Sequence, residues 1–113
     1  MIQCIAPILP AFSFEATIMF YSSKLNFTVT EQSGYLVVSD DNIEIHFYKS
    51  STKATFIKSS CFIFVRNIED MYLRLSALDI INPSGRLMVN EVGNKEFVVE
   101  DNNGHLLRFT EKK

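Results

Sequence analysis

The sequence predicts an α+β fold in which one βαβββ unit occurs twice. Two amphipathic segments, residues 14–21 and 68–75, lie about half a chain apart, and each is followed by a polar break and then by apolar runs of strand length. Each half also closes on a similar hairpin segment, residues 41–47 in the first half and 103–109 in the second. Because a unit of this size cannot bury its apolar face alone, a duplicated unit is expected to build its working surface between the two copies.

Length and composition predict a single compact domain. A chain of 113 residues is long enough for one hydrophobic core and too short for two. Its 47% of hydrophobic and 21% of charged residues are typical of a globular protein and exclude disorder. We therefore expect one domain over residues 1–113, with a first module at about 1–56 and a second at about 57–113.

Charge and hydropathy exclude several classes of partner. The formal net charge is −2, and the lysines and arginines are scattered, so no nucleic-acid surface is predicted. No apolar run is long enough to cross a bilayer, and residues 1–7 lack the charged head and long apolar centre of a signal peptide. We expect a cytoplasmic protein in which Cys4 and Cys61 are buried, reduced thiols.

Strands and one helix are expected in order along the first module. Residues 3–10 resemble a strand that Pro7 and Pro10 restrict to an edge or a bend. A helix is predicted after the N-cap Ser13, because apolar residues recur at helical spacing at Phe14, Ile18, Tyr21 and Leu25. Strands follow at 27–31, 35–39 and 43–49. Alternation in the last of these separates two faces, Ile43, Ile45 and Phe47 on one and Glu44, His46 and Tyr48 on the other.

The second module is expected to repeat this order after a polar link at residues 50–59. Residues 61–65 are apolar on both faces, which is typical of a central strand. Asn67 is a candidate cap for a helix with the stripe Ile68, Met71 or Tyr72, Leu75 and Leu78. Residues 82–85 form a strong turn signal, and three strands are predicted at 86–92, 96–100 and 105–110. When the two copies are aligned, His46 and Arg108 fall at the same place.

Several short segments, taken in order, resemble the vicinal oxygen chelate superfamily. This group includes glyoxalase I, extradiol dioxygenases, fosfomycin-resistance transferases and bleomycin-resistance proteins. The segments that carry the resemblance are Ala-Pro-Ile-Leu-Pro at 6–10, Phe-Glu-Ala-Thr at 14–17, Phe-Tyr at 20–21, Leu-Asn-Phe at 25–27 and the run 96–109 with its Asp-Asn-Asn-Gly turn. The resemblance covers nearly the whole chain and implies that the tandem modules form a curved, cup-shaped mixed sheet.

The same resemblance bears on metal binding. Enzymes of the superfamily hold a divalent metal through about three converging protein ligands and leave a position open for substrate. Here the matching positions carry Ala6, Ser60 and Arg108, and only His46 with its neighbour Glu44 could ligate. An arginine has no lone pair to offer and repels a metal by its charge. We therefore predict no metal, no cofactor and no catalytic residue.

This pattern is similar to that of bleomycin-resistance proteins, which are metal-free homodimers that sequester a drug. The opening segment 6–10 and the ending Leu-Arg-Phe at 107–109 are close to theirs. The resemblance implies that two subunits exchange their N-terminal strand at Pro7 or Pro10 and that the drug lies in clefts shared by both. It also places Tyr35 at the position of a cleft aromatic and Val92 where these proteins often carry a tryptophan.

The expected ligand is a small molecule, a glycopeptide-type or other antibiotic. The chain has no tryptophan for stacking on flat rings, and a net charge of −2 attracts a cationic drug only weakly. These departures weigh against bleomycin itself. The predicted ligand-binding residues are Tyr35, His46, Tyr48, Ser60, Phe62, Phe64 and Arg108. The alternative is a metal-dependent glyoxalase-, thiol-transferase- or dioxygenase-type enzyme with a metal site rebuilt around Glu44 and His46.

Each of these residues also has an ordinary structural interpretation. His46 could be a hydrogen-bonded polar residue of the sheet surface, and Arg108 could form an ion pair with Glu44 or Glu100. Tyr35 and Tyr48 could be core or dimer aromatics. Phe62 and Phe64 could belong to the core or form the floor of a pocket. His105, next to the glycine of the terminal turn, is expected at the surface.

Overall fold

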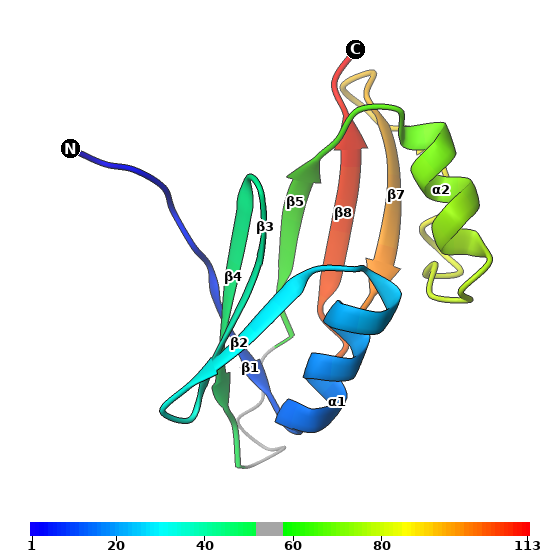
Figure 1. Cartoon of the computed structure of the whole chain (residues 1–113). Coiled ribbons are helices and arrows are strands. Elements are labelled where there is room, and N and C mark those ends of the chain that lie inside the picture. Colours follow the sequence, from blue (N-terminus) through cyan, green and yellow to red (C-terminus); the bar gives the residue numbers. More distant parts are fainter. Residues whose placement is uncertain (52–57) are drawn as a thin grey trace. The chain divides into compact units, whose positions relative to one another are not determined.

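The computed structural model describes residues 1–51 and 58–113, which divide into two compact units, Met1–Lys58 and Ser59–Lys113. Both units follow the order strand, helix, then three strands (Figure 1). The first contains β1 (Ile8–Ala11), α1 (Phe14–Met19), a π-helical turn η1 (Phe20–Lys24), β2 (Thr28–Gln32), β3 (Tyr35–Asp40) and β4 (Ile43–Lys49). The second contains β5 (Ser60–Phe64), α2 (Ile68–Ser76), β6 (Met88–Val89), β7 (Lys95–Glu100) and β8 (Leu106–Glu111). The predicted α+β fold with two βαβββ modules is confirmed.

Each unit forms one four-stranded mixed sheet. The strand orders are β1-β4-β3-β2 and β5-β8-β7-β6. In both sheets the first strand runs parallel to the last, and the remaining pairs are antiparallel. The two units therefore share one topology. None of the helices within the described residues is long and apolar enough to cross a membrane.

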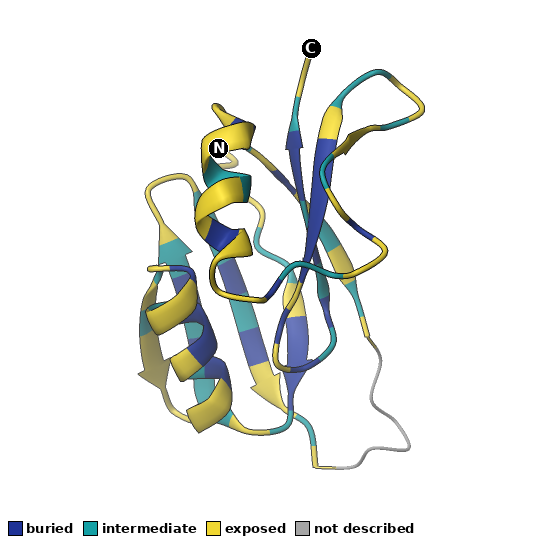
Figure 2. Cartoon of the chain, turned by 90° about the vertical axis from the view of Figure 1, so that its right-hand side faces the viewer, coloured by how far each residue is buried: buried dark blue, intermediate teal, exposed yellow. Residues whose placement is uncertain are grey.

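The helix of the first unit begins where the sequence predicts. The Ser13 hydroxyl accepts a hydrogen bond from the backbone N–H of Ala16 at 3.1 Å, which satisfies a donor that the first helical turn leaves free. On η1, Tyr21 is fully buried, and its ring lies 5.2 Å from that of Phe47 on β4. Along β3 and β4 buried residues alternate with partly exposed ones (Figure 2), and the core side of these two strands consists of Leu36, Val38, Ile45 and Phe47.

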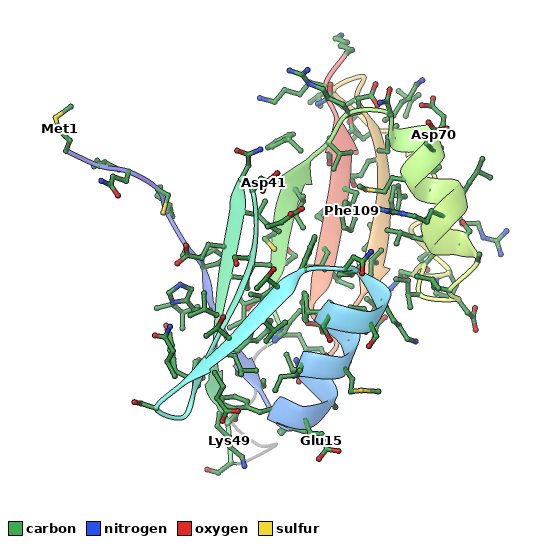
Figure 3. The ribbon with its side chains drawn as sticks, in the orientation of Figure 1. Met1, Glu15, Asp41, Lys49, Asp70 and Phe109 are labelled. Carbon is green, nitrogen blue, oxygen red and sulfur yellow. The ribbon has the colours of Figure 1, made fainter. Side chains whose placement is uncertain are left out.

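The strand expected at residues 3–10 is shorter than predicted. Pairing with β4 starts where the N–H of His46 donates to the Pro7 carbonyl, and residues 1–5 are exposed. If the parallel register continued by one step, the nitrogen of Pro7 would have to donate to the Glu44 carbonyl, and proline has no N–H. The segment before Pro7 therefore leaves the sheet, and Met1 lies at the end of an extended arm (Figure 3). Cys4 lies on this arm and is exposed, so the prediction of a buried thiol is wrong there, whereas Cys61 is half-buried.

Helix α2 begins at the predicted residue but is capped in another way. Asn67 adopts a left-handed conformation (φ 55°) and makes no capping hydrogen bond with its side chain. The N–H of Ile68 instead donates to the Glu111 carboxylate at 2.8 Å. Ile68 and Leu75 are buried and the Tyr72 ring packs on Phe97 at 5.2 Å, as the stripe predicts, but Leu78 lies beyond the end of the helix and is exposed.

Two strands of the second unit differ from the prediction. β5 is at the edge of its sheet, not at the centre, and the side chains of Phe62 and Phe64 are each 57% exposed. The strand expected at 86–92 contains only Met88 and Val89, because the Asn90 carboxamide oxygen accepts from the backbone N–H groups of Val92 and Asn94 and folds the chain into a turn. Four of the six residues of β7 and the core side of β8 are buried.

His105 is a core residue, and the prediction that it lies at the surface is wrong. Its side chain is fully buried, and its Nδ1 accepts a hydrogen bond from the backbone N–H of Ser59 at 2.9 Å. The backbone N–H of His105 donates to the Asp101 carboxylate at 2.8 Å. The bond from Ser59 to the His105 ring therefore attaches the start of β5 to the turn before β8. The predicted polar link at 50–59 lies in part outside the described residues, because it includes 52–57.

Candidate functional site

The predicted site residues lie on the face of each sheet that is turned away from its helix. On β4 the buried side chains of Ile45 and Phe47 point to the core, and the alternating positions carry His46 and Tyr48. On β5 the buried Ile63 separates Phe62 from Phe64 in the same way. The residues fall into a first-unit group of Tyr35, His46 and Tyr48 and a second-unit group of Ser60, Phe62, Phe64 and Arg108.

Strand register places His46 and Arg108 at equivalent positions. His46 is paired with Ile8 on β1 and with Val37 on β3. Arg108 is paired with Phe62 on β5 and with Val98 on β7. The two residues that align when the sequence copies are compared therefore also occupy the same position in their two sheets. By the same register, Tyr35 in the first unit corresponds to Glu96 in the second.

In the first unit three polar side chains form a continuous hydrogen-bonded chain. The ring nitrogen Nδ1 of His46 lies 3.0 Å from the Tyr35 hydroxyl, and Nε2 lies 2.6 Å from Oε1 of Glu44. The His46 and Tyr35 rings meet edge to face, with centroids 5.2 Å apart. The side chains of His46 and Glu44 are 22% and 40% exposed. His46 is therefore a hydrogen-bonded residue that remains partly accessible from solvent.

In the second unit Arg108 forms an ion pair, but with neither of the predicted partners. Its Nη2 donates to Oε2 of Glu96 at 2.9 Å. The other oxygen of the buried Glu96 carboxylate accepts from Asn90 at 3.2 Å and from the Thr110 hydroxyl at 3.3 Å. Glu100, which the sequence suggested, accepts from Asn82 instead. Sequence reasoning missed Glu96, although alternation along the predicted strand puts it on the same face as Val98.

An aromatic pair with two cations lies beside this ion pair. The rings of Phe62 and Phe64 are stacked, with centroids 6.0 Å apart. The guanidinium carbon of Arg108 lies 5.5 Å from the centroid of Phe62, and the Lys112 ammonium lies 4.5 Å from that of Phe64, within the range of cation–π attraction. Nε of Arg108 is buried and donates to no acceptor among the described residues. The core interpretation of both phenylalanines is wrong, because they are more than half exposed.

Two predicted residues lie at the margins of these groups. Tyr48 is paired in register with Tyr35 on one side and Pro10 on the other, and its ring is exposed. Ser60 is the first residue of β5, is paired with Leu106, and is also exposed.

The side chains present do not fit the catalytic metal that the superfamily enzymes carry. Arg108 supplies a permanent cation in place of a ligand, and Ala6 and Ser60 supply no imidazole or carboxylate. Both ring nitrogens of His46 are engaged, one by Tyr35 and one by Glu44. Within residues 1–51 and 58–113, no three His, Cys, Asp or Glu side chains are grouped so that they could hold a metal ion.

Comparison with known proteins agrees with the resemblance in the sequence. A bleomycin resistance protein from Geobacillus stearothermophilus is 28% identical over an alignment of 127 positions, which covers 96% of this chain and 96% of the relative. Among solved structures, a bleomycin resistance determinant encoded on the transposon Tn5 has a TM-score of 0.83 at 19% identity and covers 99% of both chains. A bleomycin-binding protein complexed with bleomycin has a TM-score of 0.79 at 16% identity and covers 99% of this chain and 100% of its own.

The fold is shared with an enzyme as well. Lactoylglutathione lyase from Agrobacterium tumefaciens has a TM-score of 0.77 at 10% identity and covers 96% of this chain and 92% of its own. No protein-family model matches the chain. The resemblance to the vicinal oxygen chelate superfamily, and within it to bleomycin-resistance proteins, is confirmed. Because the fold includes both binders and an enzyme, the fold alone does not decide the function.

Proposed function

We propose that this protein binds an antibiotic of the bleomycin type and sequesters it without breaking a bond in it. The observation that carries the proposal is the similarity to a bleomycin resistance protein over 96% of both chains. The solved bleomycin-binding protein complexed with bleomycin has the same fold. We take the two units to be modules of one domain that acts in the cytoplasm.

The chemistry of the two residue groups supports binding over catalysis. In the second unit the stacked, exposed rings of Phe62 and Phe64 offer apolar area to a flat ligand group, and the partly exposed Arg108 beside them can orient it. In the first unit the partly exposed His46 and Tyr35 offer polar contacts of their own. The position that carries a metal-binding glutamate in the enzymes carries Arg108, whose charge is already paired with Glu96. We therefore propose that binding is independent of metal and that no residue of this surface is catalytic.

We further propose that the protein acts as a homodimer that exchanges its N-terminal arms and holds the ligand in clefts at the dimer interface. The arm carries exposed apolar side chains at Met1, Ile2 and Ile5, which water solvates poorly. It leaves β4 at Pro7, where the parallel ladder ends. Deletion of residues 1–5 is expected to convert the dimer to monomers in light scattering coupled to gel filtration. A full-length chain that is monomeric at micromolar concentration contradicts this part of the proposal.

Ligand binding is tested by thermal unfolding with and without bleomycin after removal of metals with a chelator. A ligand at one hundred times its dissociation constant stabilises the folded state by about 2.7 kcal/mol. For a domain of this size that corresponds to an increase in Tm of about 10 °C. Bleomycin recovered from the mixture should have an unchanged mass. A metal-specific increase in Tm together with turnover of the compound would show the enzyme alternative instead.

A pair of variants separates the proposed surface from general effects on stability. Phe62→Ala removes an exposed ring of the aromatic pair and is expected to weaken bleomycin binding at least tenfold. Leu73→Ala removes an exposed apolar side chain on α2 (71% exposed, against 57% for Phe62) and should leave binding unchanged. Equal affinities of the two variants would mean that the aromatic pair takes no part in binding.

A further inference from the structure

The hydrogen bonds around His46 fix which of its two ring nitrogens carries the proton. As a carboxylate, Glu44 can only accept hydrogen bonds, so the His46 nitrogen that faces it, Nε2, must carry a hydrogen. In the neutral ring this leaves Nδ1 with a lone pair and no hydrogen. The Tyr35 hydroxyl, 3.0 Å from Nδ1, is then the donor of that bond. The proton positions follow from the partners, as in any hydrogen-bond network of this kind.

This assignment determines what the Tyr35 hydroxyl can offer to a ligand. A phenol has one hydrogen to donate and lone pairs that accept. Because the hydrogen is used for His46, only the lone pairs remain available. We propose that Tyr35 is a specificity-determining residue that accepts a hydrogen bond from an N–H or O–H donor of the bound molecule, and that Glu44 acts through His46 to set this preference. The inference rests on the proposed function, since it assumes that this face of the sheet meets a ligand.

The surroundings of His46 favour a fixed arrangement. Its cross-strand neighbours are Ile8 on β1 and Val37 on β3, which offer neither a donor nor an acceptor side chain to the ring. The titratable groups on this face are Glu44 and Tyr48 on β4 and Tyr35 on β3, and β1 contributes none. Consecutive hydrogen bonds polarise one another when they are partly shielded from water. The negative charge of Glu44, at one end of this series of hydrogen bonds, therefore increases the electron density on the Tyr35 oxygen at the other end.

Among the described residues, only the first unit carries this arrangement. The equivalent pair in the second unit is Glu96 and Arg108, in which the strand-β8 residue is a donor with no tautomer to choose. A polar contact therefore lies at this place in both sheets, and of these two pairs only the first-unit pair includes a hydroxyl whose hydrogen-bonding direction depends on a neighbour.

The first test needs no ligand and measures the state of His46 directly. Nitrogen-15 NMR of the imidazole of the full chain at pH 7.5 is expected to show the form with hydrogen on Nε2. Tyr35→Phe should shift the Nδ1 resonance towards that of an unbonded ring nitrogen. Tyr72→Phe, a hydroxyl deletion on α2, should leave it unchanged. A predominant form with hydrogen on Nδ1 overturns the inference whether or not any ligand binds.

The second test uses bleomycin as the probe and isothermal titration calorimetry at the same pH. Loss of one accepted hydrogen bond predicts that Tyr35→Phe binds about 3- to 10-fold more weakly than the unmodified chain. Glu44→Gln keeps the shape of the side chain, but an amide can donate as well as accept, so Nε2 of His46 no longer has to carry the hydrogen. This variant should therefore lose part of the affinity for bleomycin that Tyr35→Phe loses. Tyr72→Phe should bind as the unmodified chain does. Unchanged affinity in Tyr35→Phe and Glu44→Gln overturns the inference. If the unmodified chain does not bind bleomycin, the proposed function fails for this ligand, and the NMR result still decides whether the hydroxyl has the stated polarity.

Discussion

Replacement of Arg108 by methionine is the sharpest test of how the second-unit group is held together. The change keeps a long, flexible side chain beside Phe62 but removes the charge and the hydrogen bond to Glu96. The Glu96 side chain is 10% exposed and, within residues 1–51 and 58–113, keeps only Asn90 and Thr110 as partners, both on the same oxygen. The variant therefore leaves one carboxylate oxygen poorly solvated and without a donor.

The expected loss follows from the geometry. A hydrogen bond to a charged group contributes about 1.5–3 kcal/mol when it is shielded from water. The Arg108 side chain is 36% exposed, so solvent screens part of this attraction. Methionine also removes Nε, a buried donor that has no acceptor among the described residues, and this offsets a further part. We expect Arg108→Met to lower the free energy of unfolding by about 1–2 kcal/mol.

Urea denaturation of three variants measures this value and its origin. Glu96→Gln should cost less than Arg108→Met, because an amide oxygen can still accept from Thr110. The double variant should lose about 1 kcal/mol less than the sum of the two single losses, since the two side chains are in contact. Arg86→Met, at an exposed arginine, is the control and should change stability by less than about 0.5 kcal/mol. A loss below that limit for Arg108→Met would refute the reasoning and show that the pair is solvated.

Four further outcomes follow from single residues. Gly85→Ala should destabilise the chain by about 1–3 kcal/mol in urea denaturation, because the added Cβ would lie 2.5 Å from the Cβ of Val98. Gly34→Ala meets no atom within 4 Å and should cost only about 1 kcal/mol, from its positive φ of 75°. In alkylation followed by peptide mass spectrometry, the exposed Cys4 should be modified well before Cys61, whose pKa is raised chiefly by burial. Because the folded state keeps the Cys61 proton that the unfolded state releases, stability should fall as the pH rises above about 9, and Cys61→Ala should lack this fall.

The sequence predicted best those features that depend on a few neighbouring residues. Alternation along residues 43–49 gave β4 its bounds and separated its two faces correctly. Ser13 was recognised as a cap because its hydroxyl bonds within the first helical turn. The matched position of His46 and Arg108 also came from the sequence, because a duplicated unit keeps its spacing from the hairpin to the last strand.

Features that depend on strand order or on distant partners were not predictable in this way. The apolar run before α2 suggests a central strand, but β5 is an edge strand whose outward phenylalanines carry cations over their rings. The cap of α2 is Glu111, 43 residues away in the chain, so no local pattern could identify it. His105 is buried because it accepts from Ser59, a partner that only the parallel pairing of β5 and β8 brings close.

Because the two units share one strand register, the two residue groups occupy equivalent positions in their sheets, although their side chains differ in chemistry. In each unit the last strand lies between the first strand, to which it is parallel, and the third, to which it is antiparallel. This pairing puts His46 in one unit and Arg108 in the other at the same position between two neighbouring strands. The backbone fixes this meeting point without specifying which side chains meet there. In the first unit Tyr35 and His46 form a polar contact with no net charge when the ring is neutral, and in the second Glu96 and Arg108 form an ion pair. The same place in the sheet therefore holds an acceptor-and-donor pair that depends on a tautomer in the first unit and a permanent cation with its carboxylate in the second.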